Sequence, residues 1–129
     1  MRSNTTADNN TAVGYQAAYA NTTGSGNTAI GTLALRSNTT GTNNIAIGDA
    51  PSGSSYGTLH LNTTGTQNVA IGTHALLNNT TGSRLTALGY RALYNSTAND
   101  CTALGFQALN ANTTGYQNVA VGGGALYSV

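Results

Sequence analysis

The fold is decided by an eleven-residue stretch, residues 21–31, which is Asn21-Thr22-Thr23-Gly24-Ser25-Gly26-Asn27-Thr28-Ala29-Ile30-Gly31. It opens with an Asn-Thr-Thr triplet and closes with an Ala-apolar-Gly triplet. Both triplets return together along the whole chain, at a period close to that of the smaller solenoid repeats. The chain is therefore a repeat protein, and its architecture follows from one unit.

The Ala-apolar-Gly triplet occurs seven times, at spacings of 17, 17, 24, 17, 16 and 17 residues: Ala12-Val13-Gly14, Ala29-Ile30-Gly31, Ala46-Ile47-Gly48, Ala70-Ile71-Gly72, Ala87-Leu88-Gly89, Ala103-Leu104-Gly105 and Ala120-Val121-Gly122. The Asn-Thr-Thr or Asn-Ser-Thr triplet begins eight residues earlier each time, at Asn4, Asn21, Asn38, Asn62, Asn79, Asn95 and Asn112. The units then span residues 4–20, 21–37, 38–61, 62–78, 79–94, 95–111 and 112–128. On this alignment all length variation falls between the Gly of one triplet and the next Asn.

The third unit carries seven extra residues within 49–57, a segment rich in turn-forming residues that holds the only proline, Pro51. We expect one protruding surface loop there. A domain boundary is the alternative interpretation. The repeat resumes in phase at Asn62, which favours a single repeat domain over residues 1–129.

The residues before each Gly alternate in character, as in a short strand. Thr28 and Ile30 would face one way, and Asn27, Ala29 and Gly31 the other. The small face suits close approach by another backbone, so a strand packed on both sides is expected. The Ala-Leu pair that follows in most units is expected to form either a second strand or a short helical turn.

The Asn-Thr-Thr-Gly element supplies a corner, because Asn and Gly accept left-handed backbone angles and Thr hydroxyls bond nearby backbone groups. Each unit is then one coil of an all-β, parallel β-solenoid or β-roll with seven coils of about 17 residues. Gly and β-branched residues in every unit argue against a helical solenoid. Stacking would place identical residues in ladders, with dry Asn and Thr ladders bonding along the axis.

The assembly state follows from the small apolar content of each coil. Two large apolar side chains per coil contribute on the order of 1.5–3 kcal/mol each when buried. Ordering the backbone costs roughly 1–2 kcal/mol per residue, only partly offset by ladder hydrogen bonds. A homotrimer or a stacked filament is therefore expected. The absence of an evident polar cap at either end of the repeats favours the head-to-tail filament as the alternative to the trimer.

Composition excludes several classes of function. Only 5% of residues are charged, there is no Lys, Glu or Trp, and the formal net charge is +1. Nucleic acid and anionic membranes need clustered basic residues, so neither is an expected partner. No apolar run is long enough for membrane insertion, and no signal segment opens the chain. Gly122-Gly123-Gly124 lacks the Lys of a phosphate-binding loop, so no enzyme activity and no cofactor are expected.

The Asn-x-Ala-apolar-Gly core, as in Asn44-Ile45-Ala46-Ile47-Gly48 and Asn68-Val69-Ala70-Ile71-Gly72, resembles the low-complexity repeats of phage tail fibres. It is also similar to the left-handed parallel β-roll heads of trimeric autotransporter adhesins, although those heads use a shorter repeat and lack the intervening Ala-Leu-x-x-Asn-Thr-Thr-Gly stretch. The resemblance spans essentially the whole chain. It implies a homotrimeric extracellular shaft or head that presents adhesive tips or binds a surface.

The Asn triplets also match the acceptor pattern for N-glycosylation, which makes Asn4, Asn21, Asn38, Asn62, Asn79, Asn95 and Asn112 candidate glycan sites. The competing interpretation is that these residues only form the corner of the coil, and we favour it. A glycosylated filament would carry a row of sugars along its length.

Four further features are candidates for a site. His60 and His74 lack nearby acidic partners such as Asp49, Asp8 or Asp100 for a metal set, and we expect isolated surface histidines. Cys101 stands where most units have Asn, and we expect a small buried residue without nucleophilic function. Two aromatic rows recur, and we favour packing over stacking on sugars. Their members are Tyr15, Tyr90 and Phe106 in one row and Tyr19, Tyr94 and Tyr127 in the other.

The sequence therefore predicts a non-enzymatic structural protein of an extracellular fibre, located on a virion, on a cell surface or in a secreted filament, with copies of itself as its main partner. A self-polymerising filament subunit is the second hypothesis. A receptor- or carbohydrate-binding module, carried by the aromatic rows or by the 49–57 loop and directed at cell-surface glycans, is the third.

Overall fold

The computed structural model describes residues 2–128 and contains seven strands, one in each unit. They are β1 (Thr11–Val13), β2 (Thr28–Ile30), β3 (Ile45–Ile47), β4 (Val69–Ile71), β5 (Thr86–Leu88), β6 (Thr102–Leu104) and β7 (Val119–Val121). No helix occurs between residues 2 and 128. The all-β prediction is confirmed.

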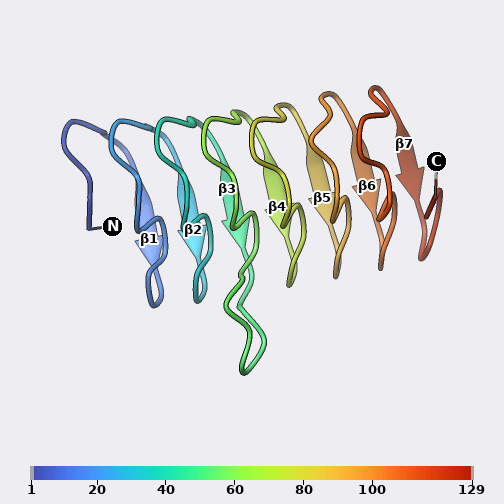
Figure 1. Cartoon of the computed structure of the whole chain (residues 1–129), viewed down its shortest axis with the longest axis horizontal. Helices are drawn as coiled ribbons and strands as arrows, with labels where there is room; N and C mark the ends of the chain where they lie inside the picture. The colour runs from blue at the N-terminus through green and yellow to red at the C-terminus, as the bar shows by residue number, and fades with distance from the viewer. Residues whose placement is uncertain (1, 129) are drawn as a thin grey trace.

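The seven strands form one parallel sheet in the order of the chain, β1 to β7. Every pairing keeps the repeat in register, so that Ala12 lies beside Ala29 and Ala29 beside Ala46. Figure 1 shows the coils side by side along the long axis, with the two ends of the chain at opposite ends of the stack. The fold is a β-solenoid of about seven turns, as the period predicts.

The two faces of the sheet differ from the expectation of packing on both sides. The middle residue of β2 to β7, such as Ala29, Ala46 or Ala70, is buried inside the coil, whereas Ala12 of β1 is partly buried. The apolar residues on either side point outward, and Ile30 and Leu88 remain 38% and 47% exposed. The predicted packing on both sides is not met within one chain, where the Ala side chains pack inside against the buried Leu residues of the core. The larger side chains are left on the outer face.

Two features require glycine at the end of each triplet: a positive φ angle and the close approach of the backbone of the next coil. Gly31 has a φ of +123°, and a Cβ there would overlap the carbonyl oxygen of Gly48 in the next coil. Gly14, Gly72, Gly89 and Gly105 repeat the arrangement against the next Gly along the axis. The Gly column therefore lets adjacent coils approach at the point where the strand ends.

The Ala-Leu segment forms neither a second strand nor a helical turn. It is a series of turns in which the Leu itself is left-handed, with φ of 51° at Leu35 and 52° at Leu76. Such angles are costly for a non-glycine residue. In the second, fourth, fifth and sixth coils they persist because the Leu is fully buried against the Ala column and its backbone N–H donates to the next coil, as from Leu35 to Thr58 at 3.0 Å.

The corners confirm the predicted ladders. Asn38 donates its side-chain amide to Asn21 at 2.7 Å, and Asn62 donates to Asn38 at 2.8 Å, all three being fully buried. On the adjacent row the hydroxyl of Thr22 donates to the carbonyl of Thr39, and that of Thr39 to the carbonyl of Thr63, each at 3.0 Å. The corner is held by hydrogen bonds along the axis. The left-handed residues lie further on, at Gly26 and Asn43.

The position of the one-residue deletion corrects the sequence alignment. In the sixth coil the buried corner position is occupied by Ser96, and Asn95 lies instead beside Asn78, which donates to it at 2.8 Å. Ser96 is followed by Ala98 after one residue, whereas Asn79 is followed by Gly82 after two. The missing residue is therefore in the corner itself, and the match of Asn95 to the other triplets is coincidental in structural terms.

Candidate functional site

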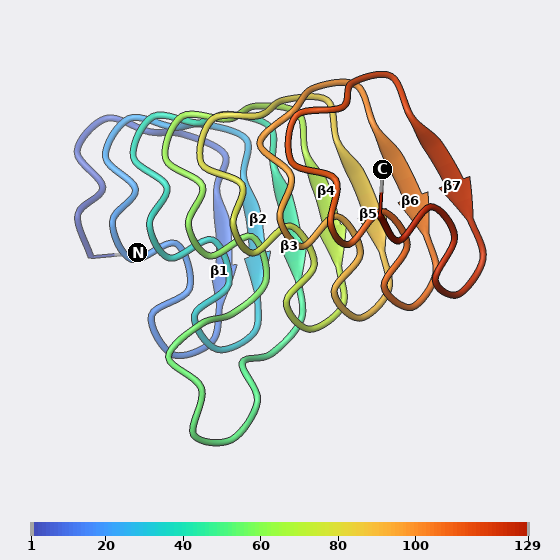
Figure 2. The same cartoon turned by 45° about the vertical axis from the view of Figure 1, so that its right-hand side comes forward.

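The inserted loop is the largest departure from the regular stack. It protrudes beyond the ends of the strands in Figures 1 and 2, between β3 and the rest of its coil. Pro51, Ser52 and Gly53 at its tip are exposed, and Gly57 at its base is buried against the backbone of Leu33. A protruding loop is thus confirmed, and its base is fixed to the coil below.

Three side chains fasten this loop. The carboxylate of Asp49 accepts a hydrogen bond from the backbone N–H of Thr32, which lowers the pKa of that carboxyl. The other two side chains are those of His60 and His74. The expectation of isolated surface histidines was wrong for both. They are 3% and 8% exposed.

The two histidines contact the loop from neighbouring coils. The backbone N–H of Gly57 lies 3.2 Å from Nδ1 of His60, whose ring packs edge-on against Tyr56 at 5.2 Å. Nε2 of His74 lies 3.1 Å from the carbonyl oxygen of Tyr56. Burial is the main cause that lowers the pKa of each imidazole, opposed by hydrogen bonding to the backbone carbonyl of Leu33 for His60, at 3.2 Å, and of Tyr56 for His74. Both rings are therefore held in the neutral form at neutral pH.

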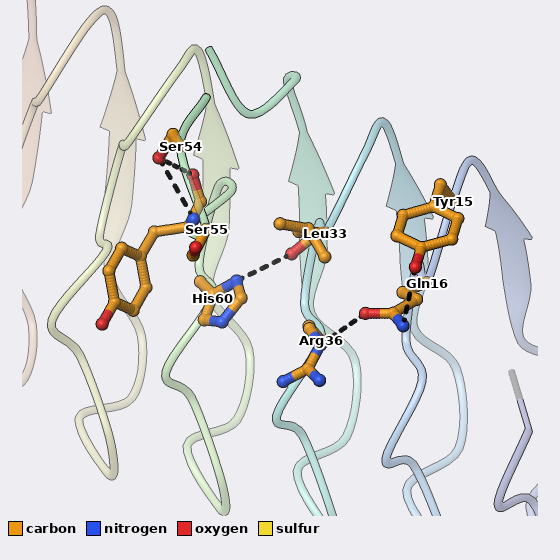
Figure 3. A pocket seen from close by; sticks show the side chains of 8 residues that line it. Tyr15, Gln16, Leu33, Arg36, Ser54, Ser55 and His60 are labelled. Carbon is orange, nitrogen blue, oxygen red and sulfur yellow. Dashed lines mark hydrogen bonds between the residues drawn. The ribbon is translucent and has the colours of Figure 1, made fainter. Parts of the chain in front are cut away.

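A pocket of about 510 Å³ opens between the loop and the first three coils. Its lining combines aromatic rings, hydroxyl and amide groups and one cation, and Figure 3 shows it from close by. The lining residues are Tyr15, Gln16, Leu33, Arg36, Ser54, Ser55, Tyr56 and His60. Its volume is within the range of small-ligand sites, roughly 300–1,000 Å³.

Arg36 is the cation of this pocket and it is held in place from two sides. Its Nε donates to Oε1 of Gln16 at 2.8 Å, and its guanidinium lies 5.5 Å from the ring centre of Tyr19. Gln16 is itself oriented by a bond from its Nε2 to the hydroxyl of Tyr15. The terminal nitrogens of Arg36 point away from Gln16 in Figure 3 and have no carboxylate partner among residues 2–128.

The aromatic rows are partly continuous. Tyr90 and Phe106 stack at 5.5 Å with nearly parallel rings, and Arg91 lies over both Tyr90 and Tyr94. Tyr15 is separated from this group, because Thr32, Asp49 and Thr73 occupy the intervening positions of its row. The packing interpretation fits Tyr90 best, since Phe106 stacks on it but is 57% exposed, and Tyr15 is 69% exposed at the rim of the pocket.

The candidate glycan sites fall mainly in the interior. Asn21, Asn38, Asn62, Asn79 and Asn112 are buried with their side-chain nitrogens donating to backbone or side-chain acceptors. A glycan is attached to that same nitrogen, so these amides have no room for one in the folded coil. Asn4 is exposed and Asn95 half-buried. The structure favours the corner role over a sugar row.

Cys101 is buried, as predicted, and its thiol lies 3.2 Å from the carbonyl of Gly115. Within residues 2–128 no group of three or more His, Cys, Asp or Glu side chains is placed to hold a metal ion. Nor does that part of the chain contain a helix long and apolar enough to cross a membrane. Arg84 and Asp100 form the single ion pair of the described residues, on the exposed surface.

No protein-family model, curated protein or solved structure matches this chain. The pocket is therefore defined by its own geometry. Sequence reasoning singled out the 49–57 loop and Tyr15 but missed Arg36 and Gln16. The available signal was the unit length. Residues 16 and 36 are 20 positions apart, which is one 17-residue coil plus three residues, so they lie close together once a coil is assumed.

Proposed function

We propose that the chain is a non-enzymatic structural segment of an extracellular fibre, in which copies associate through the outer face of the sheet as a homotrimer. The observation that carries the proposal is the outward row of apolar residues along β1 to β7. Val13, Ile30, Ile47, Ile71, Leu88, Leu104 and Val121 form one column of this face.

The second column of the face consists of Thr11, Thr28, Ile45, Val69, Thr86, Thr102 and Val119. Neither column contains a charged residue. Each half-exposed aliphatic side chain that moves out of water contributes on the order of 1 kcal/mol, so contact along the column favours association. Contiguous apolar surface of this kind marks an interaction site in a soluble protein.

A second copy of the chain fits this outer apolar face best, because its own outer face has the same distance between successive side chains. Side chains along the column recur at the inter-strand distance of about 4.8 Å. A parallel copy presents the same spacing, so every residue of the column finds an equivalent neighbour. Three narrow faces turned toward a common axis would enclose their apolar columns, which is the arrangement that the resemblance to trimeric β-roll heads implies.

The test combines mass in solution with electron microscopy of the purified chain. The expected result is a discrete particle of three chains. Ile30→Lys together with Leu88→Lys should yield monomers, because both side chains point outward and leave the core intact. Thr40→Lys, on an exposed corner position, is the matched control and should stay trimeric. Long filaments would instead identify a self-polymerising subunit, and a wild-type monomer at all concentrations would sink both assemblies.

A further inference from the structure

We propose that the pocket beneath the 49–57 loop binds an anionic sugar, a hexose-type ring that carries one carboxylate or sulfate group. This inference is independent of the assembly proposed above. It rests on the combination of two exposed tyrosines, one fixed guanidinium and several short polar groups around one opening.

The aromatic groups suit the ring of a sugar. Tyr15 from the first coil and Tyr56 from the loop are 69% and 48% exposed, and both line the pocket. An aromatic face carries partial negative charge, which attracts the weakly positive C–H groups on the apolar face of a pyranose. Since Tyr56 already packs edge-on against His60, its ring is held at the rim before any ligand arrives.

The charged group suits a single anion. Arg36 keeps its two terminal nitrogens free while Nε is occupied by Gln16, which leaves the end of the guanidinium available for a bidentate contact. No Asp lines the pocket to compete for it, and Asp49 at the base of the loop is committed to the backbone of Thr32. An anion at this position would meet an unpaired, partly desolvated and preoriented cation.

The other residues that line the pocket limit the chemical class of the ligand. Ser55 offers a hydroxyl group, which suits a ligand with several hydroxyls, while the Ser54 hydroxyl is bonded to the backbone of Tyr56 and stiffens the rim. One cation is too few for a polyphosphate or nucleic acid, whose affinity depends on many neutralised charges. A purely apolar ligand would leave the end of Arg36 and the Ser55 hydroxyl desolvated without partners. A singly charged sugar satisfies all of these groups together.

The experiment is saturation-transfer NMR and calorimetry on the full chain with four probes: methyl glucuronide, methyl glucoside, lactose 3-sulfate and lactose. We expect saturable binding of an anionic probe, with a Kd of about 1 mM, and at least about tenfold weaker binding of its neutral partner. Whichever anionic probe binds more tightly identifies a carboxylate or a sulfate as the group recognised.

Variants separate the pocket from the rest of the surface. Arg36→Gln should abolish the preference for the anionic probe, and Arg36→Lys should retain part of it. Tyr56→Ala should weaken binding of charged and neutral probes alike. The controls are Arg84→Gln and Tyr116→Ala, an arginine and a 70% exposed tyrosine that lie outside the pocket. Circular dichroism of each variant confirms the fold.

Equal binding of charged and neutral probes, absence of saturable binding by either anionic probe, or unchanged binding by Arg36→Gln would each overturn the assignment. Loss of binding in the Arg84→Gln control would do the same, because it would indicate a diffuse charge effect. None of these outcomes depends on the oligomeric state, so failure here leaves the fibre proposal standing and the reverse also holds.

Discussion

The side-chain amide of Asn38 donates to the side-chain oxygen of Asn21 one coil away, at 2.7 Å, while it also donates to the backbone of Gly41 in its own corner. One residue thus closes its turn and links two coils. Because both side chains are fully buried, no water is available to replace a lost bond.

Replacing Asn38 with Ala should lower the free energy of unfolding by about 2–4 kcal/mol, because it removes both bonds and the one that Asn62 donates to Asn38. The buried side-chain oxygen of Asn21 then loses its donor. Urea denaturation measures the loss. Thr40→Ala is the control in the same corner: Thr40 is exposed, and the change should stay within about 0.5 kcal/mol. Equal effects of the two variants would show that the ladder contributes nothing.

The Gly column predicts a larger effect. Gly31→Ala places a methyl group against the carbonyl of Gly48 and forces a φ of +123° on a residue with a Cβ. We expect a loss of about 3 kcal/mol or more, and separation of the second and third coils. Gly123→Ala is the matched control, since nothing lies within 4 Å of its added methyl group. Thermal melts of both variants compare them, and a neutral Gly31→Ala would refute the proposed packing.

Much of this architecture follows from the sequence because the repeat constrains it. The Asn-Thr-Thr and Ala-apolar-Gly triplets keep a separation of eight residues, which predicts one corner and one strand in each unit. A parallel stack of coils in register follows from this. Ladders of identical buried Asn are then a necessity, since each amide must find a partner in the adjacent coil. These features depend on period and residue type alone.

The faces of the strand could not be assigned in this way. Alternation separates Ala29 from Ile30 but does not say which lies inside, and the usual rule that larger apolar residues are buried gives the wrong answer. The inside of the coil is already occupied by Leu35 and its equivalents, which take left-handed φ angles and pack against the Ala column. Such angles are unexpected for Leu, so the sequence gives no warning of them.

The pocket was hidden for a similar reason. It depends on how the 49–57 loop folds back over the coils, which is set by two histidines whose burial the sequence does not reveal. An isolated His in a polar chain is usually exposed. Only the path of the loop places Tyr56 between His60 and His74 and so completes a concave surface.

A column of buried Asn residues runs beside the sheet and is interrupted at Cys101, so the effect of placing Asn there can be tested. Asn27, Asn44 and Asn68 each donate to a corner carbonyl, for example from Asn68 to Gly82 at 2.8 Å. Cys101 takes the same place and directs its thiol at the carbonyl of Gly115. A thiol is a much weaker donor than an amide.

Cys101→Asn should therefore be tolerated and should raise the free energy of unfolding by about 1 kcal/mol if the amide reaches Gly115 as its equivalents do. Cys101→Ser is the control, because its hydroxyl is shorter and should give a smaller gain or a loss. Thiol reagents should react with wild-type Cys101 only after unfolding, since it is fully buried. A marked destabilisation by Asn would indicate that the column is apolar at this coil by necessity.

The loop should loosen in acid. Burial lowers the pKa of His60 and of His74 below the usual value, so the unfolded chain binds more protons than the folded one. Stability contributed by the neutral rings is fully present above the ordinary histidine pKa of about 6.5 and is lost as the pH falls through the lower folded values. The groups that face His60 are Arg36, Tyr56 and His74, and none of them supplies a negative charge to compensate.

His74 is faced by Arg91, Tyr90 and Tyr94 as well as by the loop, so its protonation also adds a cation beside a cation. We expect the backbone amides of Tyr56 and Gly57 to exchange faster with solvent as the pH falls from about 7 to about 5, after correction for intrinsic exchange, while the amides of the distant β7 keep their protection. The double variant His60→Gln with His74→Gln should show no such dependence. If wild-type protection is constant across this range, the histidines are not what holds the loop, because a charged imidazole could not keep these buried contacts unchanged.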